Sequence, residues 1–403
     1  MDGNSGGSDD DTSLGPSTRA VHDGEARVRD DRSIATPIVH ASTYPFADTA
    51  ELVAFMQGEH ERPEEYGRYG NPTVAACEAK LAALEGGSAA VLTSSGMAAI
   101  TTTLLSMLKA GTHLVLTSDV YRKTRQFALS VLSRYGVEVD IVPPTVESLR
   151  AAIKPNTKVV FTEAPTNPYG RLVDLEALVT LAKDNRAKTI IDATFATPIN
   201  MRPLEYGIDL VVHSTTKYLG GHNDLLGGVV VGKGPIVEAI REQHGTLGAV
   251  ADPHTAFLTM RGVKTLALRV ARQNDSALQL ARMLEAHSAV ARVWYPMLQS
   301  HPDHALAQRY LRGGGGVLSF ELRGGLEAGS RLVDAVRIPK LAASLGGVES
   351  LIEQPPLMSF FELSPEQRAA VGITEGLVRM SVGIEDTADL EADLRAALDG
   401  LGT

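Results

Sequence analysis

The chain has 403 residues, of which 44% are hydrophobic and 21% charged, and a formal net charge of -10. This composition predicts a globular protein with enough apolar material for two domains. The acidic balance argues against nucleic acid or an anionic membrane as partner, and no apolar run reaches the roughly 18 residues of a membrane span. One cysteine excludes an intrachain disulfide, and the acidic N-terminus is unlike a signal peptide, so we expect a cytoplasmic protein.

The N-terminal part lacks the pattern of a folded core. Residues 1–18 carry three consecutive aspartates and no apolar periodicity, which predicts a disordered tail. An irregular arm with a short helix near 49–57 should follow. In the next loop, EYGRYGNPT, Tyr66 and Arg68 stand two residues apart, so in an extended segment both can face one anion. The alternative is an arginine that lies in a loop by chance.

Short apolar strands alternate with amphipathic helices between residues 89 and 232. The expected strands lie at 89–93, 113–117, 137–142, 158–162, 188–192, 209–213 and 228–231. The expected helices lie at 97–108, 123–133, 146–153 and 175–185. This α/β rhythm predicts a mostly parallel seven-stranded sheet with helices on both faces. Because ligands of such sheets bind at the carboxyl ends of the strands, the residues after each strand are the informative ones.

Those residues form a chemically coherent set. A small-residue turn, SSGM, opens a helix at Gly96 and Met97, where free N–H groups suit a phosphate. The next strand is followed by an aromatic side chain and two cations, at Tyr121 and the two residues after it. The segment EAPTNP places the amide of Asn167 at the same rim. Asp192 ends a buried strand, where a carboxylate needs a cation such as the protonated ring nitrogen of a cofactor.

The stretch VVHSTTKYLGGHNDLLGG, residues 211–228, carries a lysine at the end of a strand. Lys217 is flanked by the hydroxyl groups of Ser214 and Thr216 and followed by glycines that permit close approach. This arrangement would present an amine for Schiff-base chemistry beside a phosphate. A lone lysine after a strand is otherwise a surface residue, so the assignment depends on the rest of the chain.

The remainder of the chain predicts a smaller α/β domain. One or two long helices should span 255–285, and strands should lie at 289–295, 316–322 and 378–381. Arg379 stands in the last of these strands as a candidate receptor for a carboxylate. The alternative is an ion pair with Glu385 or Asp386.

Two further features set the organisation of the chain. The sequence HPDH at 301–304 resembles metal-ligand spacing, but no cysteine or third clustered ligand accompanies it, so we predict a helix start and no metal site. We place the tail and arm at 1–62, the large domain at 63–255 and the small domain at 256–403.

Seven motifs in order resemble those of one enzyme family. GRYGNPT, SSGMAAI, TNP, DATFATP, HSTTKYLGGHND, SLGGVESLIEQP and VRMSVGIED are similar to the Cys/Met-metabolism family of pyridoxal-phosphate enzymes over about residues 33–400. Within it, EYGRYGNPT, YRKTR and KYLGGHND look most like the plant-type cystathionine γ-synthases. The resemblance implies pyridoxal 5′-phosphate (PLP) as cofactor, fold type I of the aspartate aminotransferase kind, and a homotetramer of two dimers with shared active sites.

The resemblance also implies roles for individual residues. Lys217 would form the Schiff base and move protons, Asp192 would pair with the ring nitrogen, and Tyr121 would stack on the ring as a second catalytic residue. The other cofactor contacts would be Gly96, Met97, Thr194, Ser214 and Thr216, with Tyr66 and Arg68 reaching across from a neighbouring subunit. The substrate carboxylate would bind Arg379, Ser344 and Asn167, and a distal anionic group would bind Lys123.

The implied reaction is a γ-substitution on an activated homoserine, as its O-phospho or another O-acyl ester. L-Cysteine would add to a vinylglycine-type intermediate to give cystathionine. The alternative is a γ-lyase or γ-replacement enzyme that acts on an unusual amino acid in a specialised pathway, and a catalytically silent cofactor-binding protein is a third reading. Methionine γ-lyases resemble the chain less, because Arg122 and Lys123 stand where they carry a glycine and a reactive cysteine.

Overall fold

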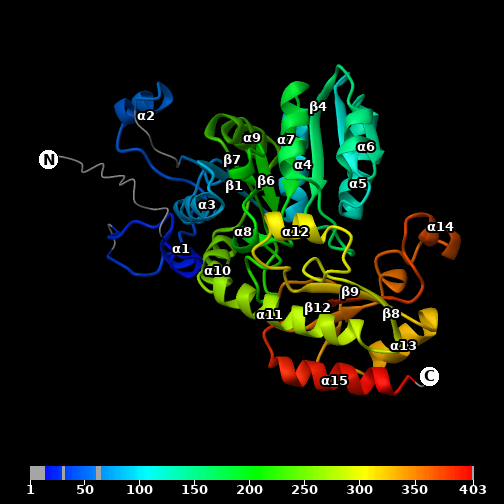
Figure 1. The fold of residues 1–403 in the computed structure, drawn as a ribbon. Coiled ribbons are helices and arrows are strands. Elements are labelled where there is room, and N and C mark those ends of the chain that lie inside the picture. The colour runs from blue at the N-terminus through cyan, green and yellow to red at the C-terminus, as the bar shows by residue number, and fades with distance from the viewer. Residues whose placement is uncertain (1–13, 30–31, 60–64, 402–403) are drawn as a thin grey trace.

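The computed structural model describes residues 14–29, 32–59 and 65–401, which build two β-sheets with helices packed around them (Figure 1). The larger sheet consists of β1 (Ala89–Thr93), β2 (His113–Thr117), β3 (Glu138–Val142), β4 (Thr157–Glu163), β5 (Lys188–Asp192), β6 (Leu210–His213) and β7 (Gly228–Gly232). Their order is β1-β7-β6-β5-β4-β2-β3. Only β7 runs antiparallel to its neighbours, so the expected mostly parallel seven-stranded sheet is confirmed.

Helices cover both faces of the larger sheet. In β2, Leu114 and Leu116 pack with α4 (Gly96–Met107), α5 (Arg122–Ser130) and α9 (Gly234–Leu247). The intervening Val115 packs on the opposite side with α6 (Val146–Ala152) and α7 (Leu175–Asp184). This alternation follows from the two-residue period of a strand, and it explains why the strands read as continuous apolar runs. Helix α9 was not among the helices predicted from the sequence.

The smaller sheet has five strands in the order β10-β11-β12-β9-β8. These are β8 (Val290–Trp294), β9 (Val317–Leu322), β10 (Lys340–Leu341), β11 (Leu351–Glu353) and β12 (Leu377–Ser381). One face packs on α11 (Leu266–Glu285), α13 (Gly325–Ala335) and α15 (Thr387–Asp399). Because Val378 and Met380 belong to that core, Arg379 between them projects from the other face. The small α/β unit expected from the sequence is therefore present, with two short strands that were not predicted.

The remaining elements are short or lie between the two sheets. They are α1 (Pro16–His22), α2 (Thr49–Met56), α3 (Pro72–Glu85), α8 (Thr197–Asn200), α10 (Pro253–Val263), α12 (His304–Tyr310) and α14 (Pro365–Ala370). Three 3₁₀ turns are η2 (Leu132–Tyr135), η3 (Pro203–Tyr206) and η4 (Pro355–Leu357). The expected helix at 123–133 thus ends at Ser130 and continues as a tighter turn.

The last residues of the predicted tail, 16–18, are helical and not disordered as expected. The predicted tail extended to residue 18, but α1 begins at Pro16, because Ala20 is fully buried and the Arg19 guanidinium donates to the Ala83 carbonyl oxygen at 3.0 Å. Residues 1–13 lie outside the described residues. The predicted helix near 49–57 is present as α2, which stands apart from both sheets in Figure 1 and buries none of its residues.

Several smaller expectations can be compared with the structure. The HPDH sequence leads into α12, as predicted, and no cluster of three metal-ligating side chains occurs among the described residues. Cys77 is fully buried on α3 against the larger sheet, and burial raises the pKa of its thiol. Within the described ranges no helix is long and apolar enough to cross a membrane. The proposed boundary between residues 255 and 256 falls inside α10, which packs on α3.

Candidate active site

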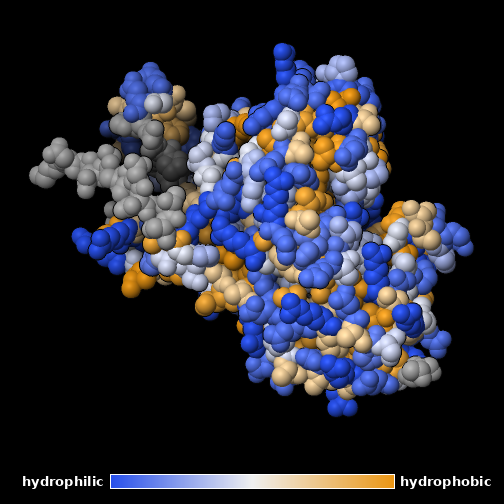
Figure 2. Space-filling model, viewed as in Figure 1, coloured by the Kyte–Doolittle hydropathy of each residue, from blue (hydrophilic) through white to orange (hydrophobic). Residues whose placement is uncertain are grey.

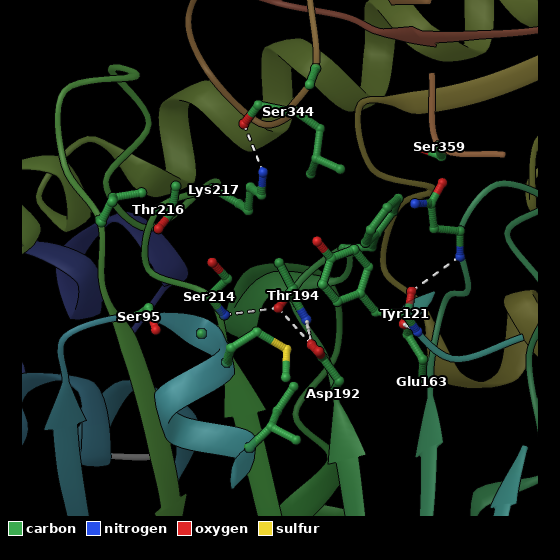
Figure 3. A pocket seen from close by; sticks show the side chains of 18 of the residues that line it. Ser95, Tyr121, Glu163, Asp192, Thr194, Ser214, Thr216, Lys217, Ser344 and Ser359 are labelled. Carbon is green, nitrogen blue, oxygen red and sulfur yellow. Dashed lines mark hydrogen bonds between the residues drawn. The ribbon is translucent and has the colours of Figure 1, made fainter. Parts of the chain in front are cut away.

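A cavity of about 410 Å³ lies where the carboxyl ends of β1, β4, β5 and β6 meet loops of the smaller sheet. Figure 3 shows that Tyr121, Asp192, Lys217 and Ser344 surround this space. All four residues line the cavity, although they are spread over 223 positions of the sequence, from 121 to 344. The residues that follow the strands are therefore brought together as expected for such a sheet.

The start of α4 forms one end of the cavity. Ser95 caps the helix by accepting the Ala98 N–H at 3.0 Å, and the preceding N–H groups of Gly96 and Met97 have no partner within the helix. A Cβ at Gly96 would lie 2.8 Å from the Ser214 Cβ, so the helix start can approach that strand only as glycine. With the hydroxyl groups of Ser214 and Thr216 on the same cavity, this end suits a phosphate.

Asp192 lies at the floor of the cavity, at the end of β5. Its Oδ1 accepts the backbone N–H of Thr194 at 3.0 Å and the Thr194 hydroxyl at 2.5 Å. Burial raises the pKa of this carboxyl above its usual range, with Thr194 acting in the opposite direction. No lysine or arginine of the described residues forms an ion pair with it. A carboxylate in this state is matched by a cation that enters the cavity.

Lys217 reaches the cavity from the loop after β6. Its Nζ donates to the Ser344 Oγ at 2.7 Å. Burial lowers the pKa of Lys217 to about 8, helped by the positive charge of Arg379 and opposed by Glu353. Ser344 has φ = 95°, a strained backbone region for a residue with a side chain. An amine with a lowered pKa is a better nucleophile at neutral pH than an exposed lysine.

Arg379 lies between the two sheets, 5% exposed. Its Nη2 donates to the Ser344 carbonyl oxygen at 2.9 Å and is 2.8 Å from Glu353 Oε1, while Nη1 donates to Asn167 Oδ1 at 3.3 Å. The expected alternative, an ion pair with Glu385 or Asp386, is wrong. Glu353 is the partner because it stands opposite Arg379 in the β11–β12 register.

Two carboxylates on the cavity were not identified from the sequence as site residues. Glu163 ends β4 beside Asp192, and Glu353 ends β11. The signal for Glu163 was the same as for Asp192, a charge at the end of a buried strand. Glu353 gave less signal, because its three-residue strand is too short for a visible pattern. Ser359, on the segment after η4, also lines the cavity and was missed (Figure 3).

Three residues of the expected site lie outside the cavity. The Lys123 ammonium donates to Gln126 Oε1 at 2.9 Å on the exposed side of α5, so the geometry gives no support to its contact with a distal anion. Arg68 donates from Nη1 to the Gly245 carbonyl oxygen at 2.7 Å, and its guanidinium lies 5.4 Å from the centre of the Tyr66 ring. Tyr66 and Arg68 were expected to serve a neighbouring subunit, and that role stays a prediction.

The residues of the cavity fit PLP. The open N–H groups of α4 would hold its phosphate, the buried Asp192 would pair with its ring cation, and Lys217 would offer an amine to its aldehyde. All three requirements of the cofactor are met by different walls of one cavity. Arg379 and Asn167 line another part of the same cavity, where they leave room for an amino-acid carboxylate beside the cofactor.

Comparison with known proteins agrees with this fit. The model of a family described as Cys/Met metabolism PLP-dependent enzyme matches residues 17–399. Cystathionine γ-synthase 1, chloroplastic, of Nicotiana tabacum is 46% identical over 95% of this chain and 71% of its own length. The L-methionine γ-lyase of Fusobacterium nucleatum subsp. polymorphum is 42% identical over 91% of this chain and 94% of its own.

A solved structure is similar over nearly the whole fold. The crystal structure of cystathionine γ-synthase from Xanthomonas oryzae pv. oryzae, in complex with aminoacrylate and cysteine, superposes with a TM-score of 0.91 at 38% identity. The match covers 97% of this chain and 99% of that one. Both the expected fold and the expected cofactor are thereby confirmed.

Proposed function

The chain belongs to the Cys/Met-metabolism family of PLP-dependent enzymes, and we propose that it catalyses γ-substitution on an activated homoserine with L-cysteine as acceptor. The Cγ–O bond of a homoserine ester would break and the thiol sulfur would bond to Cγ, which gives cystathionine and releases phosphate or a carboxylate. The observation that carries the amino-acid chemistry is the placement of the Lys217 amine beside the Ser344–Arg379 carboxylate site.

The residues of the chain have distinct parts in this reaction. PLP, when bound, supplies an electron sink for the carbon skeleton of the substrate. Asp192 keeps the ring nitrogen protonated, and Arg379 with Asn167 holds the substrate carboxylate. Lys217 is placed to take protons from Cα and Cβ and to return one, and its pKa of about 8 leaves a substantial fraction of the amine neutral near that pH. Glu353 and Ser344 hold the Arg379 guanidinium in position.

A γ-lyase, or a γ-replacement enzyme with an unusual substrate, is the second candidate, favoured by the similarity to L-methionine γ-lyases. In that case no acceptor would add at Cγ after the γ substituent leaves, and water would hydrolyse the isomerised enamine at Cα, so the products would be 2-oxobutanoate and ammonia. Incubation of the PLP-loaded protein with O-phosphohomoserine or O-acetylhomoserine, with and without cysteine, distinguishes the two. Cystathionine supports the first candidate and 2-oxobutanoate in both incubations supports the second. No turnover of either ester contradicts the first, and no turnover of any γ-substituted amino acid contradicts both.

We propose further that the protein is a cytoplasmic homotetramer whose paired subunits share active sites. Several apolar side chains of the N-terminal arm are exposed, with Ile34 at 92% and Met56 at 65%. Figure 2 shows hydrophobic residues scattered among hydrophilic ones on the face in view. Tyr66 and Arg68 are also exposed, which leaves them available to a second copy. Mixing Lys217→Ala subunits with Arg68→Ala subunits should restore activity that neither has alone, because each mixed pair contains one intact site and one site that lacks both side chains. Absence of restored activity in a verified mixed oligomer contradicts shared sites.

A further inference from the structure

The carboxyl group of Glu163 connects two loops that meet at the cavity. Its Oε2 accepts the backbone N–H of Tyr121 at 2.9 Å, and its Oε1 accepts the backbone N–H of Asn167 at 3.1 Å. The side chain comes from the end of β4 and is 4% exposed. Both oxygens are therefore engaged, and each one holds a residue from a different part of the rim (Figure 3).

Neither N–H group donates to a backbone carbonyl of the described residues, so Glu163 is the acceptor for both, across 42 residues for Tyr121 and four residues for Asn167. Tyr121 is the N-cap residue of α5, and its side chain makes no capping hydrogen bond, unlike Ser95 at the start of α4. Asn167 lies between Pro165 and Pro168, which have no N–H to donate. The carboxylate of Glu163 thus supplies the acceptor that fixes the first turn of α5 and the bend before Pro168.

The position of Glu163 is electrostatically unfavourable apart from these two bonds. It stands beside Asp192 in the sheet register, and Asp119 lies nearby. Burial, followed by the charges of Asp192 and Asp119, raises the pKa of this carboxyl well above its usual range. Among the described residues no lysine or arginine forms an ion pair with it. An amide of the same size would reduce the repulsion but would place an N–H donor against one of the two backbone donors.

The two residues held by Glu163 lie in parts of the cavity that would bind different groups, the cofactor ring and the substrate carboxylate. The Tyr121 side chain lines the part of the cavity that fits the cofactor ring. The Asn167 Oδ1 accepts a hydrogen bond from Arg379 Nη1, in the part that fits the substrate carboxylate. A shift of either backbone segment would move one of these groups relative to the other.

We propose that Glu163 is a positioning residue that sets the place of Tyr121 against the cofactor and of Asn167 against the substrate carboxylate through one side chain. It does not itself contact the reacting atoms. The inference rests on the binding of PLP and an amino acid in this cavity, but it does not depend on whether the reaction is substitution or elimination.

The test compares two amines that bind the holoenzyme and undergo no γ-chemistry. L-2-Aminobutanoate carries a carboxylate and has no γ leaving group, whereas methylamine has no carboxylate. Binding of each is followed by the change in the cofactor absorption band, and the circular dichroism of that band reports the environment of the ring. Glu163→Gln should weaken the affinity for L-2-aminobutanoate about tenfold and that for methylamine less than about twofold. It should also change the circular dichroism of the cofactor band before any amine is added.

A double-mutant cycle tests whether the effect passes through Asn167. In the Asn167→Ala background, Glu163→Gln should weaken L-2-aminobutanoate binding by less than about twofold, because the group it positions is gone. Glu138→Gln, an exposed carboxylate-to-amide exchange on β3, is the matched control and should change neither probe. If Glu163→Gln does not fold, Glu163→Asp, whose carboxylate is withdrawn from both N–H groups by one methylene, should give the same pattern.

Two results would overturn the proposal. Equal loss of affinity for both amines would mean that Glu163 only stabilises the fold. An unchanged cofactor band together with unchanged affinity for L-2-aminobutanoate would mean that Tyr121 and Asn167 are held in place by other contacts. Failure of the γ-substitution assignment would instead appear as missing cystathionine with all of these binding results unaltered.

Discussion

The cavity has two walls that are built in different ways. We call the part of the cavity that fits PLP, with Gly96 and Asp192, the cofactor wall, and the part with Arg379 and Asn167 the substrate wall. The cofactor wall consists of strand ends of one sheet. Thr194 donates to Asp192 and Ser95 caps α4, so these groups are held by neighbours close in sequence. The substrate wall joins distant segments, since Arg379 contacts Asn167 and Lys217 contacts Ser344 across 212 and 127 residues. The first wall is formed within the larger sheet, whereas the second exists only when both sheets are in place.

The largest effect should come from the residue that joins the two walls. Lys217→Ala should reduce turnover by about 10⁴-fold or more, because both the Schiff base and the proton transfers are lost. The fold should remain, since the side chain ends in a cavity and its single hydrogen bond is to a hydroxyl. Steady-state assays together with circular dichroism of the backbone check both parts. Near-normal turnover in this variant contradicts the whole assignment.

Loss of the central cation of the substrate wall should have the next largest effect. Arg379→Ala should raise KM for the amino-acid substrate about 100-fold through loss of charge-assisted hydrogen bonds. It should also destabilise the protein by about 3 kcal/mol, because Glu353 would be left buried without its partner. Kinetics and chemical unfolding measure the two effects.

A matched arginine provides the control for that variant. Arg272 forms an exposed ion pair with Asp386, so Arg272→Ala should change stability by no more than about 1 kcal/mol and leave KM unaltered. Equal effects of the two substitutions would show that the substrate wall is not a distinct site.

In the cofactor-free protein, the buried amine of Lys217 should lower the free energy of unfolding at neutral pH. Its pKa is lowered from 10.5 to about 8, so the unfolded chain binds more protons between these values and stability should rise with pH. The loss of stability caused by burying the protonated amine is fully present below about pH 8 and disappears as the pH approaches 10.5. Lys217→Met should therefore be more stable than the native cofactor-free protein at pH 7, with a gap that closes by about 1.4 kcal/mol per pH unit above pH 8. Unfolding measured across this range checks the slope, and a constant gap contradicts the lowered pKa.

The smallest effect is expected at the outer edge of α5. Lys123→Ala should change KM by less than about twofold for both O-phosphohomoserine and O-acetylhomoserine, because the ammonium binds Gln126 on the exposed side. A selective rise in KM for the phosphorylated ester would show that the side chain swings into the cavity, and would restore the role expected from the sequence.

The two walls also differ in what the sequence could predict. Asp192, Gly96 and Lys217 follow strands with clear apolar patterns, so their place at one edge of the sheet could be inferred. The partner of Arg379 could not, because Glu353 reaches it through the register of β11, which has three residues. A register of that kind depends on packing between distant segments, which no local pattern records.

Lys123 illustrates a second limit. Its sequence neighbour Tyr121 lines the cavity, yet successive residues at the start of a helix are about 100° apart, so Lys123 falls on another side of α5. Proximity in sequence was therefore a poor guide to proximity in the site.

The burial of Cys77 has a practical consequence for measuring motion in this protein. A thiol reagent can reach this side chain only when the packing around α3 opens, since the thiol is fully buried between α3, the larger sheet and α10, and its raised pKa disfavours the reactive thiolate. Because the chain has one cysteine, the rate of thiol labelling measures how often this packing opens. The labelling rates of Cys77 with and without PLP would show how far the cofactor slows an opening that exposes a residue outside the cavity.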